Sequence, residues 1–222
     1  TLCGHLASSP PTGGIQLAPN GWQALDQLGL FDAAIKRATR LNHIVVRDLD
    51  NGATLTRLDL ANHYGSIGRA DLLDLLQGAV AKHRAIKHHP ALISQAVPNK
   101  DGVELVLDDG QTMVAAALIA ADGVTGLGRR LVTGAASGEI KYPRRVAMRA
   151  DIDAANLPAV FAQPASNLWL GQAAHLVHYP MASGRRINFA VTLSAQLANS
   201  HWQAKIFGTN PLFEQLTTGQ FQ

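Results

Sequence analysis

The sequence is poor in cysteine, in basic clusters and in long apolar runs. Cys3 is the single cysteine among 222 residues, which excludes an internal disulfide and favours a reducing compartment, the cytoplasm. No stretch approaches about 18 consecutive apolar residues, so a membrane-spanning helix is not expected. The formal charge of +3 is mild and the basic residues are scattered. A nucleic-acid partner is therefore not expected either.

Motifs of several enzyme classes are also absent. The sequence has no Gly-x-Ser-x-Gly elbow and no P-loop. It has no ligand set spaced for a metal, and His88 and His89 are adjacent, so they would face opposite sides of a strand. The chain starts at Thr1 without a signal-peptide pattern. A fragment, a processed chain and simple removal of the initiator Met all agree with this start.

Helices and strands alternate in the first part of the chain. Local patterns predict a helix after Pro19 with Asn20 as N-cap and Gly29 as its stop, and a longer helix over residues 66–83. A hairpin is expected at residues 43–49 and 53–58. Further strands are expected at residues 92–97, 103–107 and 112–121. The last becomes continuously apolar before Asp122, as is typical of a strand buried on both faces.

After about residue 137 the pattern becomes mainly that of strands. The expected strands, which would form an antiparallel sheet with one buried face, cover residues 145–152, 167–170, 175–180 and 186–193. A short helical tail is expected at residues 201–207 and 211–216. Trp169 and Met148 are expected in the core. This mixed order predicts an α/β fold with α+β character, in which a second sheet is interleaved.

Five segments, in order and spacing, resemble one enzyme family. They are Gly14–Leu30, Arg69–Leu72, Ala121–Val124 with Arg129 after it, Val146–Ala150 and His175–Pro180. Together they resemble the FAD-dependent aromatic hydroxylases, the group A flavoprotein monooxygenases such as salicylate hydroxylase and 6-hydroxynicotinate 3-monooxygenase. The resemblance covers nearly the whole chain.

The resemblance implies an incomplete Rossmann-like FAD/NAD(P)-binding fold interleaved with an antiparallel substrate-binding sheet. Residues 1–41 and 64–136 would belong to the FAD-binding fold. Residues 42–63 would form a hairpin of the substrate domain, and residues 137–222 its sheet.

Two departures from the family concern the flavin. The Gly-x-Gly-x-x-Gly motif that lets the backbone approach the FAD pyrophosphate is absent, and so is the later Gly-Asp motif. Gly4, followed by His5, stands where the family usually has an acid for the adenosine ribose. We therefore expect weak or absent FAD binding by these residues alone. We also expect a complementing fragment, a homo-oligomer or further flanking residues.

The resemblance assigns FAD contacts to Gln16, Arg69, Leu92, Asp122 and Gly123. A glycine after Asp122 permits close backbone approach, and ligands of α/β sheets lie beyond the carboxyl ends of strands. A cation at a helix start is unfavourable unless an anion compensates. Each assignment has a plain alternative. Asp122–Gly123 could be a turn, Leu92 a core residue, and Arg69 solvated or paired with the acid at 71 or 74.

His175 and Tyr179 are the expected catalytic residues. Period-two geometry places them on one face of a strand with Val177 between them, while Leu176 and His178 point the other way. Their counterparts in the 6-hydroxynicotinate enzyme line the substrate site. A His and a Tyr there could bind and deprotonate a phenol, since His titrates near neutrality. Packing within an antiparallel sheet is the alternative.

The complete enzyme that the chain resembles would bind FAD and reduce it with NADH or NADPH. It would use O2 to hydroxylate a phenolic or N-heteroaromatic acid. Two other interpretations stay open at this point. One is a non-catalytic module that binds small aromatic molecules and derives from a hydroxylase, and the other is a flavin-independent α+β protein.

Overall fold

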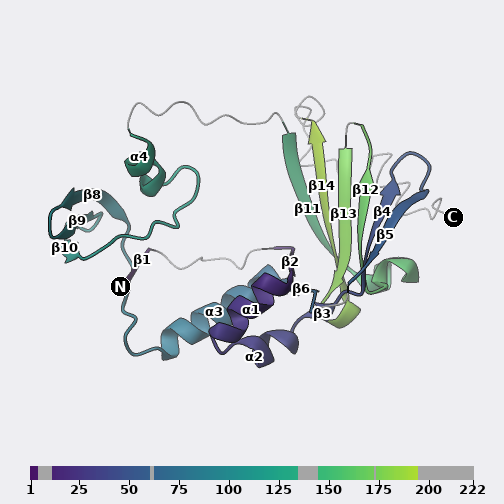
Figure 1. The fold of residues 1–222 in the computed structure, drawn as a ribbon, viewed down its shortest axis with the longest axis horizontal. Coiled ribbons are helices and arrows are strands. Elements are labelled where there is room, and N and C mark those ends of the chain that lie inside the picture. Colours follow the sequence, from purple (N-terminus) through teal and green to yellow (C-terminus); the bar gives the residue numbers. More distant parts are fainter. Residues whose placement is uncertain (5–11, 61–62, 135–144, 173, 195–222) are drawn as a thin grey trace. The chain divides into compact units, whose positions relative to one another are not determined.

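The computed structural model describes residues 1–4, 12–60, 63–134, 145–172 and 174–194 (Figure 1). The chain divides into a smaller unit, Thr1–Ser9 with Ala79–Tyr142, and a larger unit, Pro10–Gly78 with Pro143–Gln222. Each unit is described by itself. The helical tail expected after residue 200 lies outside the described residues. Within the ranges above, no helix combines the length and the apolar character needed to cross a membrane.

A six-stranded sheet dominates the larger unit, with strand order β11-β14-β13-β12-β4-β5 (Figure 1). The strands are β4 His43–Asp48, β5 Thr54–Asp59, β11 Arg145–Asp153, β12 Ala165–Leu170, β13 Ala174–Met181 and β14 Arg186–Ser194. This confirms the strands expected from alternation in both parts of the chain. All neighbours are antiparallel except β12 and β4, which run parallel. The hairpin β4–β5 therefore joins a sheet built from residues about 100 positions later.

The two faces of this sheet bury different side chains. One face carries an apolar core of Leu49, Phe161, Trp169, Ala174, Leu176, Ile187, Phe189 and Val191, with Met148 packed against it. This confirms Trp169 and Met148 as core residues. The other face carries a smaller cluster of Leu41, Tyr179 and Met181, with Val177 and Tyr64 beside it. Short 3-10 helices at Ala154–Asn156, Ala159–Ala162 and Ala182–Gly184 connect the strands.

Helices and a small antiparallel sheet make up the rest of the larger unit. The sheet has the order β2-β6-β3, from β2 Gly14–Leu17, β6 Gly65–Gly68 and β3 Thr39–Arg40. The helices are α1 Pro19–Gln27, α2 Phe31–Ile35 and α3 Arg69–Lys82. Their apolar faces share a core of Leu17, Trp22, Leu25, Ala34, Ile67 and Leu75.

Both expected helices begin at a different residue from the one predicted. The N-cap of α1 is Ala18 and not Asn20, because Pro19 occupies the first helical position, which tolerates its missing N–H. Gly29 confirms the expected stop, with a φ of +69°. Helix α3 begins at Arg69 and not at residue 66, because Gly65–Gly68 forms β6 and pairs with β2 and β3.

The smaller unit contains a short parallel pair and an antiparallel sheet. The pair joins β1 Leu2–Cys3 to β7 His88–His89. The sheet has the order β10-β9-β8, from β8 Ile93–Asn99, β9 Gly102–Leu107 and β10 Thr112–Ala115. Ala96, Val103 and Leu105 form its core, and α4 spans Leu127–Thr133.

The buried strand expected up to Ala121 is wrong. Strand β10 ends at Ala115, where its pairing with β9 ends. The segment that follows has no strand partner in the described part of the chain, and Ile119 is 92% exposed. An apolar run becomes a buried strand only where neighbouring strands and a covering layer are present.

Candidate active site

The two expected catalytic residues lie on β13 and share the face predicted for them. Val177 and Tyr179 belong to the smaller cluster, whereas Leu176 belongs to the core on the opposite face. His175 is half-buried between Leu170 and Thr192 on the neighbouring strands. Its Nδ1 atom is buried and has no hydrogen-bond partner among the described residues.

Tyr179 is 4% exposed. Burial raises the pKa of its phenol to about 12, while the positive charges of Arg149 and Arg69 act in the opposite direction. The phenol therefore stays protonated at neutral pH. At this place it can donate a hydrogen bond, but it does not serve as a base.

A pair of glycines closes the site beside Tyr179. A Cβ atom on Gly14 would collide with Met181 Sδ and would lie 2.9 Å from Tyr179 Cε2. The N–H of Gly14 donates to Asn188 Oδ1 at 2.8 Å, and Gly13 has a φ of +81°. Only a residue without a side chain allows so close an approach of backbone and phenol. We call Gly13, Gly14, Asn188 and Tyr179 the glycine corner.

Sequence reasoning missed Asn188. It lies opposite Tyr179 on β14, is fully buried, and its Nδ2 atom has no partner in the part of the chain that the structure describes. Buried amides of this kind are uncommon and call for an explanation. The signal in the sequence was a polar residue between Ile187 and Phe189 in the middle of an apolar strand.

Arg69 and Gln16, which the family motif assigns to FAD, lie next to the glycine corner. Arg69 donates from its backbone N–H to Gly13 at 3.0 Å and from Nε to the carbonyl of Gly14 at 3.2 Å. Gln16 Oε1 accepts a hydrogen bond from Tyr64 at 3.1 Å. The alternative in which Asp74 pairs with Arg69 is wrong, because Asp74 pairs with another side chain, Arg37, at 2.6 Å.

Three further expected FAD contacts, Leu92, Asp122 and Gly123, lie in the smaller unit. Asp122 Oδ2 accepts a hydrogen bond from the backbone N–H of Gly128 at 2.9 Å, in the first turn of α4. Gly123 has a φ of +83° and is exposed. The side chain of Leu92 is 51% exposed, so it is not a core residue. Its backbone N–H and C=O both bond to Asp108.

Arg69 and Asp122 belong to different units. The assignment of both residues to FAD stays a prediction. The contacts that join Gln16, Arg69 and Tyr179 all lie within the larger unit.

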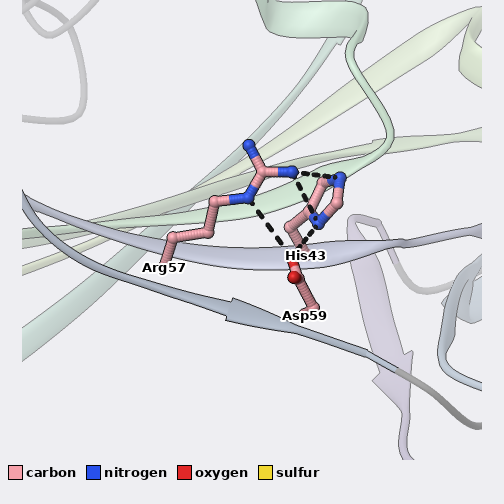
Figure 2. A network of polar contacts seen from close by, with 3 residues as sticks. All are labelled: His43, Arg57 and Asp59. Atoms are coloured by element: carbon pink, nitrogen blue, oxygen red, sulfur yellow. Dashed lines mark hydrogen bonds and ion pairs between the residues drawn. The ribbon is translucent and has the colours of Figure 1, made fainter.

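Two other features of the larger unit stand apart from these residues. His43, Arg57 and Asp59 form an exposed polar network on β4 and β5, with His43 Nδ1 2.8 Å from Asp59 Oδ1 (Figure 2). The hydrogen bond to His43 and then that to Arg57 lower the pKa of Asp59. By register this network lies on the sheet face opposite Tyr179.

The second feature is a hollow of about 530 Å³ on the helical side, and it contains none of the expected site residues. Its lining is Pro19, Trp22, Gln23, Asp26, Phe31, Arg40 and His63. Among the residues that the structure describes, no three side chains are grouped to hold a metal ion.

Comparisons with known proteins agree with this architecture. No family model matches the chain. It is 31% identical over 192 residues to 3-hydroxybenzoate 6-hydroxylase of Klebsiella oxytoca, covering 82% of this chain and 48% of that protein. It is 32% identical over 206 residues to 3-amino-4-hydroxybenzoate 2-monooxygenase PtnB3 of Streptomyces platensis, covering 87% and 49%. The chain thus spans about half the length of the curated relatives that it matches.

Among solved structures, a variant of HpxO from Klebsiella pneumoniae in complex with FAD has the same fold. The TM-score is 0.72 at 19% identity, and the match covers 95% of this chain and 58% of that one. At this identity the likeness shows the fold, a mixed α/β arrangement of several sheets. By sequence, the chain is a homologue of the aromatic hydroxylases named above, and this confirms the family resemblance.

Proposed function

We propose that the chain forms part of an FAD-dependent monooxygenase that hydroxylates a phenolic or N-heteroaromatic acid with NAD(P)H and O2. The observation that carries this proposal is the glycine corner. There, Arg69 and Tyr179 meet at one residue, Gly14. Arg69 donates a hydrogen bond to the Gly14 carbonyl, and the Tyr179 ring packs against Gly14. The family motif assigns Arg69 to the flavin and Tyr179 to the substrate. The activities of the relatives, a hydroxybenzoate hydroxylase and an aminohydroxybenzoate monooxygenase, support an aromatic acid as substrate.

The residues present fit a flavin. Arg69 uses Nε for Gly14, which leaves its terminal N–H groups for an anionic or carbonyl acceptor. Gln16 offers an amide on the adjacent strand β2. Bound FAD would supply the activation of O2, chemistry that side chains alone do not provide.

The chain's own residues would prepare the substrate. Tyr179 would donate a hydrogen bond to a polar group of the substrate, because its raised pKa keeps the proton on the phenol. His175, about 13 Å away along the strand, would take the proton of the phenolic oxygen, and the resulting phenolate would be richer in electrons at the ring. Leu41, Val177 and Met181 around Tyr179 would keep water out.

The experiment is an assay of NAD(P)H oxidation and product formation in the presence of FAD and a panel of hydroxybenzoates and hydroxynicotinates. It should be run on the 222 residues and on a version that includes the flanking coding sequence. We expect His175→Asn to lower kcat by about 100-fold, in the range of general base catalysis. An absence of hydroxylated product from the version that includes the flanking coding sequence, with flavin bound, would contradict the proposal.

A non-catalytic aromatic-binding module is the second candidate. For the 222 residues we expect weak FAD binding in a titration followed by flavin fluorescence. A module of this kind would bind aromatic acids without stimulating NAD(P)H oxidation.

A further inference from the structure

Arg149 lies in the middle of β11 and shares the sheet face of Tyr179. By register it pairs with Ala190 of β14, which pairs with Val177 of β13. Figure 1 shows β11, β14 and β13 side by side in this order. The aliphatic part of Arg149 reaches the glycine corner, since a Cβ placed on Gly13 would lie 3.8 Å from Arg149 Cδ.

The charge of Arg149 is not neutralised by the acid beside it. Asp151, two residues further along the same face, is held by Arg186, with Nε 2.7 Å from Asp151 Oδ1 and Nη2 3.0 Å from the Asp151 carbonyl. The side chain of Arg149 makes no ion pair or hydrogen bond with any other residue of the described ranges. The residue is exposed.

A second cation acts at the same place. Both Arg149 and Arg69 are close enough to Tyr179 for their positive charges to lower the pKa of its phenol against the effect of burial. Two guanidinium groups beside a neutral phenol create a positive local potential. An anion placed between them would be stabilised, and the planar guanidinium fork matches a carboxylate with two parallel hydrogen bonds.

We propose that Arg149 recognises the carboxylate of the aromatic substrate. The inference rests on the proposed function and names the residue that would select acids over uncharged phenols. Neighbouring strands lie about 4.8 Å apart, so the backbones at Arg149 and Val177, two strands apart, are separated by roughly 10 Å. An aromatic acid that lies on this face of the sheet would have its carboxylate at Arg149 and its ring over the neighbouring strands.

The test compares a charged and an uncharged ligand of the same shape. Binding of 3-hydroxybenzoate and of 3-hydroxybenzamide is measured by isothermal titration calorimetry, in buffer with FAD, for the wild type, Arg149→Gln and Arg145→Gln. Arg145 is the matched control, because it is exposed on the same face of the same strand and its loss changes the net charge equally. We expect Arg149→Gln to weaken 3-hydroxybenzoate binding by about 10- to 100-fold and 3-hydroxybenzamide binding by less than about threefold.

The outcomes separate the inference from the function on which it rests. Wild-type protein that binds neither ligand would overturn both. Two results would overturn only the role of Arg149. In one, Arg149→Gln binds 3-hydroxybenzoate as tightly as the wild type does. In the other, Arg149→Gln loses affinity for 3-hydroxybenzoate and for 3-hydroxybenzamide by the same factor. Arg149→Lys, which keeps the charge but loses the fork, should give an intermediate affinity.

Discussion

His178 and Tyr179 are neighbours in sequence and nearly equally buried, at 3% and 4% exposed, yet their surroundings differ completely. The ring of His178 stacks against Trp169 and Phe189 and meets Phe161 edge-on, with its centroid 5.0 Å away. Neither ring nitrogen has a hydrogen-bond partner among the described residues. Tyr179 instead lies beside glycine backbone, a buried amide and two cations.

The difference teaches that burial does not identify a functional side chain. Burial, with a smaller effect of Arg47, lowers the pKa of His178 to about 3, so this histidine stays neutral and acts as an aromatic core residue. Tyr179 keeps a proton among groups that can hold an anion. We therefore expect one face of β13 to serve stability and the other to serve chemistry, and the variants below test that division.

The largest effect is expected on the apolar face. Leu176 is fully buried, so Leu176→Ala should lower the free energy of unfolding by about 3 kcal/mol through lost burial and a cavity. Chemical denaturation measures this value. Leu55→Ala on β5, where the side chain is 57% exposed, is the control and should change it by less than about 0.5 kcal/mol. Similar losses for both variants would contradict the assigned core.

On the face of β13 that carries Tyr179, we expect that there is no room for an added methyl group at Gly14. Gly14→Ala should destabilise by about 2 kcal/mol, because its methyl group collides with Met181 Sδ and crowds the Tyr179 ring. Gly78→Ala in α3 is the matched control. Nothing lies within 4 Å of its Cβ position, and alanine there should stabilise the helix by about 0.5–1 kcal/mol. A tolerated Gly14→Ala would show that the glycine corner is more open than described.

His178 should make the fold sensitive to acid. Its pKa in the folded state, about 3, is below the ordinary value of 6.5, so the unfolded chain binds more protons once the pH falls below about 6.5. Stability present above that pH is lost as the pH falls, by about 1.4 kcal/mol between about pH 7.5 and 5.5. Denaturation midpoints at both values should show the loss, and His178→Phe should remove this part of it.

The smallest effect on stability is expected for Tyr179→Phe. The ring keeps its packing and only the hydroxyl is lost, so the free energy of unfolding should change by less than about 1 kcal/mol. In a complete enzyme the same change should lower kcat strongly while the free energy of unfolding stays nearly the same. A large loss of stability with normal turnover would assign Tyr179 to the core and remove it from the site.

The alternation of apolar and polar residues along the sequence was enough to predict the strands of the larger sheet. Strands β4, β5, β11, β13 and β14 follow it to within one or two residues. The order of five motif segments was enough to predict the fold class and the family. The prediction failed at two segments where strand pairing decided the structure. Residues 66–68 belong to β6, which pairs with a strand distant in sequence, and not to the helix. Residues 116–121 have no described strand partner and do not continue the strand.

The sequence by itself determined which residues form strands, which face of β13 each side chain takes, and the family to which the chain is related. These follow from backbone geometry and motif order, which are local or linear properties. Only the tertiary structure decided that β12 runs parallel to β4, that Asn188 bonds to Gly14, and that Arg149 and Arg69 act on one phenol. Such contacts join residues 30 to 174 positions apart, and their formation depends on the whole packed sheet.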